Sequence, residues 1–316
     1  MDILINIIGI IIGFILLIKG ADILVDGASA VAAKFGIPKI IVGLTVVAIG
    51  TSMPELMVSA SAALEGFSDL SIGNVVGSNI ANLLLILGIC AIINDLPFKK
   101  STAKIENPFM LIVTVILLFM ANNDNSHIIS RTEGIILITI CALYLFYNIY
   151  MAKKTDTSDE ESEVEMSVSK ALIYIIIGIV ALKFGGDFVV DNTTTLATAI
   201  GISEKLISVT LVSVATSLPE LVTSITATKK GVVDIAIGNI IGSNIFNIVL
   251  ILGVSSIISP INYAVSYNFD LILLIVMCAI FLIIPFIKKR YKMVRYQGFI
   301  FVAIYALYVL RTVILG

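Results

Sequence analysis

Two short stretches of this chain occur twice, and they decide its fold. GTSMPEL at residues 50–56 returns as ATSLPEL at 215–221, and IGNVVGSNIAN at 72–82 returns as IGNIIGSNIFN at 237–247. Both pairs are related by the same shift of 165 residues, and 12 of the 18 positions between residues 71 and 88 are identical to their partners. Chance similarity between apolar helices would match Leu, Ile and Val, but not Asn, Ser, Thr, Pro and Glu in register. The sequence therefore contains an internal duplication.

The composition places the duplicated unit in a membrane. Of the 316 residues, 59% are hydrophobic and 13% are charged, whereas soluble domains are about 45–50% apolar and about 25% charged. A helix needs about 20 apolar residues to cross the hydrocarbon core, and ten segments qualify as candidate spans. These are residues 3–24, 40–64, 71–93, 107–122, 132–151, 170–190, 205–228, 235–258, 269–287 and 295–315. We expect an all-α polytopic membrane protein.

The two copies are expected to have opposite orientations in the membrane. Equivalent points lie five spans apart, and because five is odd, the second copy enters the membrane from the other side. The chain then divides into a first five-helix repeat (1–152), an acidic linker (153–169) and a second five-helix repeat (170–316). Transporters with such inverted-topology repeats bind their substrate near the midplane, on broken helices between the repeats. The linker is interpreted as a solvated connection, with a regulatory Ca2+ site as the alternative.

The basic residues predict the orientation. With the N-terminus outside, the inside segments contain 15 Lys and Arg residues and the outside segments contain 3, and cytoplasmic loops carry the excess of Lys and Arg. Both termini are expected outside the cell (inner) membrane, with the linker in the cytoplasm. The start of the chain lacks the basic n-region of a signal peptide, so the first apolar run is interpreted as a retained, membrane-spanning helix.

Each copy of the motif carries a glutamate inside an apolar span. Glu55 and Glu220 each cost several kcal/mol or more at that depth, which makes them functional candidates. Pro54 and Pro219 each remove a helix hydrogen bond. We therefore expect the helix to unwind just before each proline, freeing the carbonyl groups of residues 48–50 and 213–215 to face a cation.

Helical spacing gathers further oxygen atoms around these carboxylates. In the first copy, Thr51 and Ser52 lie one turn before Glu55. The other candidates are Ser78 and Asn82 on the next helix, and Thr216, Ser217, Ser243 and Asn247 in the second copy. Oxygen ligands suit hard cations, of which Ca2+ takes about 6–8, whereas Zn2+ or copper favours nitrogen or sulfur. Two carboxylates match the charge of one Ca2+.

Other residues of the duplicated stretches have a predicted packing role or an open one. Gly73 with Gly77, and Gly238 with Gly242, form small-xxx-small pairs that favour close helix contact. Four asparagines could either join helices or line the ion path: Asn74, Asn79, Asn239 and Asn244. The three cysteines, Cys90, Cys141 and Cys278, lie far apart in apolar runs and are interpreted as packing residues.

The two motif pairs resemble the alpha repeats of the Ca2+/cation antiporter superfamily, and within it the prokaryotic Na+/Ca2+ exchanger branch. The resemblance implies that Ca2+ is bound by Glu55, Glu220 and the backbone of Thr51 and Thr216. It implies that Na+ is bound by Glu55, Glu220, Ala48, Ser52, Ser78, Ser213, Ser217 and Ser243, with Asn82 and Asn247 at the central polar positions. Ala215 departs from the usual Gly of the second motif. Asn247 stands where K+-dependent exchangers have Asp, so its neutrality argues against K+ dependence.

The sequence thus predicts electrogenic, K+-independent exchange of Na+ for Ca2+ by alternating access. Ca2+/H+ antiport through the same glutamate pair is the alternative, and a passive channel also stays open. An intramembrane hydrolase is disfavoured because His127 is the only histidine, and such chemistry needs a metal-binding His set or a nucleophile with its base. We expect no enzymatic activity, no cofactor beyond the transported ions, no nucleic-acid partner, and function as a monomer in the lipid bilayer.

Overall fold

The computed structural model describes residues 2–123, 127–154, 166–199, 216–289 and 291–315, and it is mainly α-helical. Within these residues, eight helices are long and apolar enough to cross a membrane, and one bent pair of shorter helices, Lys39–Thr51 with Met53–Glu65, brings the number to nine. The expected span at 205–228 lies partly outside the described residues. Its described part is the helix Leu218–Lys229.

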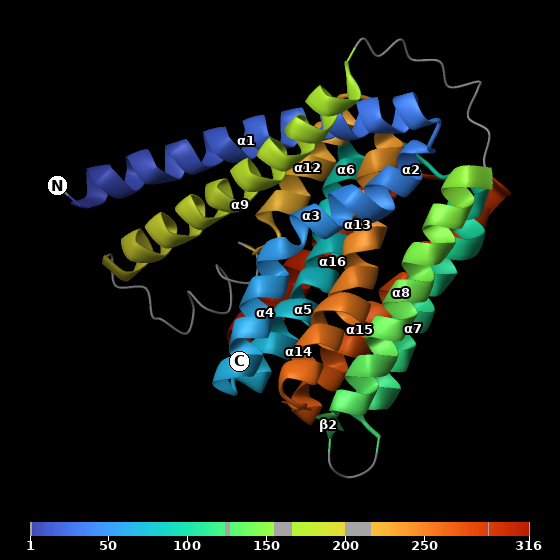
Figure 1. Ribbon diagram of the computed structural model, residues 1–316. Helices are drawn as coiled ribbons and strands as arrows, with labels where there is room; N and C mark the ends of the chain where they lie inside the picture. The colour runs from blue at the N-terminus through green and yellow to red at the C-terminus, as the bar shows by residue number, and fades with distance from the viewer. Residues whose placement is uncertain (1, 124–126, 155–165, 200–215, 290, 316) are drawn as a thin grey trace.

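The helices pack into a single bundle, and the two longest lie across most of the others (Figure 1). The part before the linker contains α1 (Asp2–Phe35), α2 (Lys39–Val42), η1 (Gly43–Val47), α3 (Ala48–Thr51), α4 (Met53–Glu65), α5 (Ser68–Ile80), η2 (Ala81–Ile86), α6 (Leu87–Ile93), η3 (Thr102–Glu106), α7 (Asn107–Ala121) and α8 (Arg131–Lys154). The part after it contains α9 (Val168–Ala199), α12 (Leu218–Lys229), α13 (Val233–Phe246), η5 (Asn247–Leu252), α14 (Gly253–Ile258), η6 (Val265–Tyr267), α15 (Asn268–Ile283), η7 (Ile284–Lys289) and α16 (Arg295–Leu315). The segments η1, η2, η3 and η5 are π-helical, and η6 and η7 are 3-10 helices.

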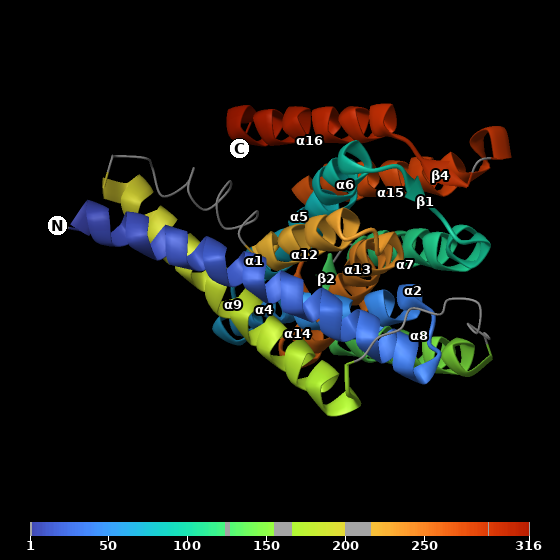
Figure 2. The same cartoon turned by 90° about the horizontal axis from the view of Figure 1, so that it is seen from above.

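The two longest helices, α1 and α9, lie side by side and extend beyond the rest of the bundle (Figures 1 and 2). Glycines let their backbones approach closely: a Cβ on Gly13 would lie 2.8 Å from the carbonyl oxygen of Gly185, and a Cβ on Gly20 would lie 3.0 Å from that of Gly178. The two contacts run in opposite directions along the sequence, so the helices are antiparallel. Both are longer than the expected spans 3–24 and 170–190, because an apolar run measures membrane thickness and not where a helix ends.

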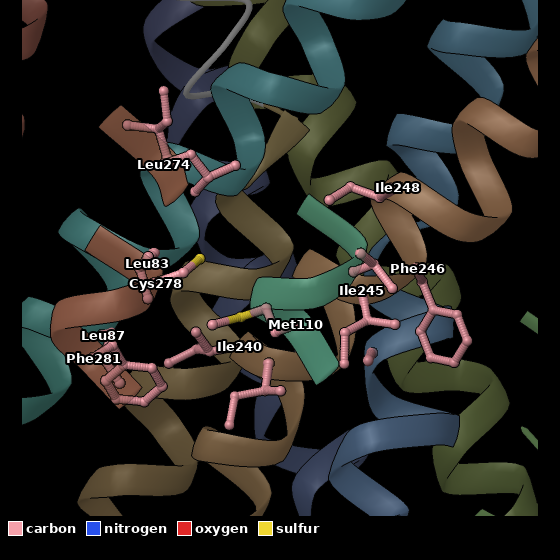
Figure 3. Close-up of a cluster of buried hydrophobic side chains, with 14 of the residues drawn as sticks. Leu83, Leu87, Met110, Ile240, Ile245, Phe246, Ile248, Leu274, Cys278 and Phe281 are labelled. Atoms are coloured by element: carbon pink, nitrogen blue, oxygen red, sulfur yellow. The ribbon is translucent and has the colours of Figure 1, made fainter. Parts of the chain in front are cut away.

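The most enclosed helices carry the repeated Ser/Asn motif. In the apolar stretch of Val233–Ile258, 94% of the residues are buried, against 72% in Ser68–Ile93 and 17% in Arg295–Ile314. Figure 3 shows the apolar side chains around this centre, where Ile240, Ile245 and Phe246 lie among residues of α6, α7 and α15. The three cysteines are buried and unpaired, in agreement with the packing role expected for them.

Two short strand pairs join the ends of the two halves. β1 (Leu96–Pro97) pairs antiparallel with β4 (Lys292–Met293), and β2 (Ile128–Ile129) pairs antiparallel with β3 (Ile261–Asn262). Each pair connects two loops that the count of basic residues assigns to the same side of the membrane. Beside β1 and β4, the Lys292 ammonium group lies 2.7 Å from the Asp95 carboxylate, and its hydrogen bond holds the pKa of Asp95 below the ordinary value.

Small residues bring α13 against the segment that precedes the first motif. A Cβ on Gly238 would lie 2.6 Å from the carbonyl oxygen of Ile40, and one on Gly242 would lie 2.7 Å from that of Leu44. The expected packing role of these two glycines is therefore seen directly for the second copy. In the first copy, a Cβ on Gly73 would meet only the Tyr267 ring, with its hydroxyl oxygen 3.1 Å away.

We expect Gly242→Ala to destabilise the protein by about 1–3 kcal/mol, the usual cost of overpacking a close contact. Gly186→Ala is the matched control, because a Cβ there would meet nothing closer than 3.9 Å and the gain in helix propensity is the same. The measurement is the thermal unfolding of both purified variants in detergent. Equal or higher stability of Gly242→Ala relative to Gly186→Ala would contradict the assigned helix contact.

Candidate cation-binding site

The first copy of the motif is a broken helix with Ser52 at the break, and Ser217 has nearly the same backbone conformation directly before α12. Ser52 has φ −83° and ψ 8° between α3 and α4, and Ser217 has φ −85° and ψ 5° before α12. The two segments at Ser52 are bent by 47°. Pro54 and Pro219 lie in the first turn of the helices that follow, where a missing N–H group costs little.

The break is shorter than we expected. Residues 48–51 remain helical, and the carbonyl oxygen of Ala48 accepts hydrogen bonds from the Ser52 N–H group at 3.0 Å and the Thr51 hydroxyl at 3.3 Å. The helix therefore breaks just before Pro54, as expected, but the expectation that the Ala48 carbonyl group is freed there is wrong. Because the proline begins a new helix, a single residue is enough to redirect the chain. The corresponding residues 213–215, with the candidate Ser213, lie outside the described residues.

The two glutamates follow the breaks and are fully buried. Glu55 and Glu220 lie in the first turns of α4 and α12, and both are 0% exposed. They lie close enough for their charges to interact. Both carboxylate oxygens of Glu55, and Oε2 of Glu220, have no hydrogen-bond partner among the described residues. A buried carboxylate in this condition is costly unless a positive charge compensates it, and the helix N-termini provide only part of that compensation.

Each carboxylate faces the break that belongs to the other copy. Glu220 Oε1 accepts a hydrogen bond from the Ser52 hydroxyl at 2.9 Å, and the Ser52 oxygen lies 3.0 Å from that of Ser243. On the other side, the Glu55 carboxyl lies near Thr216 and Ser217, although neither its oxygens nor the Ser217 hydroxyl forms a hydrogen bond in the described structure. The hydroxyls of both breaks thus surround the carboxylate pair.

Asn74 and Asn239, whose role the sequence left open, join the two copies. The Thr51 hydroxyl donates to Asn239 Oδ1 at 3.0 Å, and the Thr216 hydroxyl donates to Asn74 Oδ1 at 3.2 Å. Each asparagine also donates within its own copy, from Asn74 to Ser59 at 2.9 Å and from Asn239 to Ser224 at 3.0 Å. These are structural bonds that occupy the threonine hydroxyls. Their signal in the sequence is the recurrence of both asparagines and both serines at the same shift.

The second pair of asparagines orients the central polar positions. Asn79 donates to the carbonyl oxygen of Asn244 at 3.1 Å, and its own Oδ1 accepts from Asn247 at 3.0 Å. Asn247 Oδ1, both side-chain polar atoms of Asn82 and the Ser78 hydroxyl are buried without hydrogen-bond partners among the described residues. Asn82 and Asn247 lie within and at the start of the π-helices η2 and η5, and π-helical turns are frequent at functional sites.

Of the candidate residues predicted from the sequence, the structure links Glu55, Glu220, Thr51, Ser52, Thr216, Ser217 and Ser243 through direct interactions. Ser78, Asn82 and Asn247 are buried on the two central helices with free polar atoms. The carbonyl group of Ala48 lies at the break and accepts a hydrogen bond from the Ser52 N–H group, and it shares the Thr51 hydroxyl proton with Asn239.

The sequence profile of the sodium/calcium exchanger protein family matches residues 5–150 and 170–314. This chain belongs to that family. The match covers both copies of the motif and leaves out the acidic linker.

This exchanger-family chain resembles characterised and uncharacterised membrane proteins over most of its length. It is 39% identical over 260 residues to the inner membrane protein YrbG of Escherichia coli, with 79% of each chain covered. It is 31% identical over 339 residues to the sodium/calcium exchanger MaX1 of Methanosarcina acetivorans, covering 95% of this chain and 96% of the other. A solved structure of the sodium-calcium exchanger NCX_Mj superposes with a TM-score of 0.85 at 31% identity, covering 96% of this chain and 97% of that one.

The candidate site consists mainly of neutral oxygen atoms, with two carboxylates as its charged groups. Among the described residues, no group of three or more His, Cys, Asp or Glu side chains could hold a metal ion. The buried pair Glu55 and Glu220 is therefore the acidic part of a site whose other ligands must be hydroxyl, amide and carbonyl oxygens. Such a set fits hard cations and not transition metals.

Proposed function

We propose that this protein is a secondary active antiporter that exchanges Na+ for Ca2+ across the cell membrane by alternating access, in an electrogenic and K+-independent cycle. The observation that carries the proposal is the pair of fully buried carboxylates, Glu55 and Glu220, of whose four oxygens three have no partner among the described residues. Two negative charges in a buried site match one Ca2+ or two Na+. Membership of the sodium/calcium exchanger family supports this assignment.

The proposed architecture is ten transmembrane helices in two inverted-topology repeats, with both termini outside and the linker in the cytoplasm. Its support is the matched bonding of the two copies, in which Thr51 contacts Asn239 and Thr216 contacts Asn74. The strand pairs β1–β4 and β2–β3 add to this support, because each joins loops assigned to one side. Alternating access follows from two similar halves that face opposite sides.

The proposed ligands of Ca2+ and Na+ share the two carboxylates and differ in the other oxygen atoms. Ca2+ is bound by the carboxylates of Glu55 and Glu220 and by the carbonyl groups of Thr51 and Thr216, whose hydroxyls are already engaged with asparagines. Na+ shares the carboxylates and takes the remaining candidate oxygens. These belong to Ala48, Ser52, Ser78, Ser213, Ser217 and Ser243. Asn82 and Asn247 provide neutral oxygens at the centre.

Ca2+ flux in proteoliposomes tests the proposal and separates it from Ca2+/H+ antiport, which would load protons on the same glutamates. We expect Ca2+ uptake driven by a Na+ gradient alone, without K+ on either side, because Asn82 and Asn247 add no carboxylate for a further monovalent cation. Uptake driven equally by a proton gradient with no Na+ would favour the Ca2+/H+ antiporter. Strict dependence on K+ would refute the proposed selectivity, and downhill Ca2+ leak without any counter-ion would indicate a channel.

The exchange is expected to respond to voltage. The carboxylate pair carries two negative charges, which one Ca2+ neutralises, and further Na+ at the hydroxyl oxygens gives the Na+-loaded state a net positive charge. A membrane potential acts on each elementary charge with about 2.3 kcal/mol per 100 mV. An inside-negative potential, imposed with a K+ gradient and valinomycin, should accelerate Na+ entry and Ca2+ exit. Ca2+ flux that is the same at every imposed voltage would show an electroneutral cycle.

A further inference from the structure

A second group of buried oxygens lies where α7 begins, on elements that contribute nothing to the glutamate pair. Thr102, Glu106 and Asn107 at the start of this span are 1%, 5% and 0% exposed, and Tyr144 of α8 is 4% exposed. Polar atoms of all four, together with the Tyr147 hydroxyl, are inaccessible and have no hydrogen-bond partner among the described residues. No ion pair that the described residues form includes Glu106.

These side chains come from two helices that pack together. Thr102 and Glu106 begin and end the π-helix η3, and Tyr144 and Tyr147 lie one turn apart on α8. The Tyr144 ring stacks on Phe109 of α7, with ring centroids 4.8 Å apart and planes 9° apart. The charge of Glu106 acts on both phenol groups, so both lie near this carboxyl.

The second half of the chain has an acid and a tyrosine at the corresponding positions, together with a basic residue. A shift of 164 residues places Glu106 on Asp270, Tyr144 on Tyr308 and Tyr147 on Arg311. There, the charge of Arg311 acts on Asp270, and Tyr308 lies beside the same carboxyl, while the Arg311 guanidinium lies 3.5 Å from the centroid of the Phe269 ring. The π-helix is also specific to the first half, because the corresponding turn, Val265–Tyr267, is a 3-10 helix. The first half therefore has the acid and the tyrosine, and Tyr147 stands where the second half has Arg311.

We propose that Thr102, Glu106, Asn107, Tyr144 and Tyr147 form a second cation site, separate from the transport pathway, that binds one monovalent hard cation, Na+ or K+. The cation takes the place that the Arg311 guanidinium has in the second half. The donor set is entirely oxygen, and its single carboxylate matches a single positive charge, whereas a divalent ion would leave an uncompensated charge in a buried position. Glu106 is the last residue of the π-helix η3 and Asn107 is the first of α7, and both side chains are buried.

The test uses full-length protein in detergent with the transport pair neutralised, Glu55→Gln with Glu220→Gln, so that remaining cation effects come from elsewhere. Thermal unfolding is followed while NaCl or KCl replaces choline chloride at constant ionic strength. We expect saturable stabilisation, because an ion that binds only the folded state stabilises it according to its concentration relative to Kd. Adding Glu106→Gln should abolish the saturable part. Tyr144→Phe or Tyr147→Phe should weaken the apparent affinity about 3- to 10-fold.

Glu65→Gln is the control in the same background, since Glu65 is an exposed carboxylate, and it should leave the saturable stabilisation unchanged. Stabilisation that is absent before Glu106 is changed, or that survives Glu106→Gln, would overturn the site. If a proton occupies Glu106 instead, unfolding will not depend on Na+ or K+, which also overturns it.

If the triple variant does not fold, the same question is answered by equilibrium binding of radioactive Na+, and of Rb+ in place of K+, to otherwise unchanged protein. Glu106→Gln should then bind one ion fewer than the parent, and an equal number would overturn the site. These measurements do not use Ca2+ transport. Failure of the proposed exchange therefore leaves them interpretable, and their failure leaves the exchange untouched.

Discussion

Glu55→Gln, and separately Glu220→Gln, should abolish Na+-driven Ca2+ flux while leaving the protein folded. Each change removes one of the two charges that compensate Ca2+ in a site where both side chains are 0% exposed. Loss of one partner from a buried charge pair costs about 3–5 kcal/mol, which corresponds to a loss of affinity of more than about 100-fold. Glutamine keeps the shape of the side chain, so the unfolding temperature in the absence of Ca2+ should not fall.

The control for this experiment is Glu65→Gln. Glu65 is the last residue of α4, and Glu55 lies in the first turn of the same helix. The Glu65 side chain is exposed, so the same chemical change there should leave the flux at the parental level. The measurement is Ca2+ uptake into proteoliposomes, together with Ca2+ binding to the detergent-solubilised variants. Near-parental uptake in both glutamine variants would remove the two carboxylates from the proposed site.

The acidic centre could be predicted because a charge at membrane depth has few explanations. Glu55 and Glu220 are conspicuous in apolar runs, and their recurrence with Thr, Ser and Pro points to one site. Nine of the ten expected spans also coincide with helices long and apolar enough to cross a membrane, counting the bent pair as one. The ends of the helices could not be predicted from the sequence. Helix α1 continues past residue 24 to Phe35, and its Asp22 and Asp26 carboxylates both lie 2.6 Å from the Lys230 ammonium group. A hydropathy average over neighbouring residues cannot identify ion pairs between segments that are distant in the sequence.

The details of the break and its support depend on tertiary packing. Proline chemistry predicts that a helix hydrogen bond is lost near Pro54, but not that the distortion collapses onto Ser52. The π-helices are equally invisible, since sequence periodicity does not separate a π-turn from an α-turn over five or six residues. Asn74 and Asn239 could be recognised as repeated polar residues, whereas their partners could be known only once α4 and α12 were placed beside the opposite copy.

Those partners suggest that the site is held by bonds that cross between the copies. Asn239 is 0% exposed, accepts a hydrogen bond from Thr51 and donates one to Ser224. Asn239 therefore holds Thr51, the residue before the break, against α13 of the other half. Thr51 is the residue whose carbonyl group we assign to Ca2+. Asn74 does the same for Thr216, so both breaks are tied to a helix of the other copy by an asparagine.

Asn239→Leu should consequently impair transport more than its distance from the carboxylates suggests. The change leaves the Thr51 hydroxyl with only its longer bond to the Ala48 carbonyl oxygen, at 3.3 Å, and it removes the donor that Asn239 gives to the Ser224 hydroxyl. An unsatisfied buried polar group costs about 1–3 kcal/mol, so we expect Ca2+ flux to fall at least about 10-fold with a lower unfolding temperature. A double-mutant cycle with Thr51→Val isolates the bond between the copies, because the valine removes only the hydroxyl, and a coupling of about 0.6–1.7 kcal/mol is typical between membrane helices. Thr139→Val, which removes an exposed hydroxyl bonded within its own helix, serves as the control in the same cycle. If Thr51→Val and Asn239→Leu prove additive, their bond does not hold the site, and the positions of the two breaks must be set by helix packing alone.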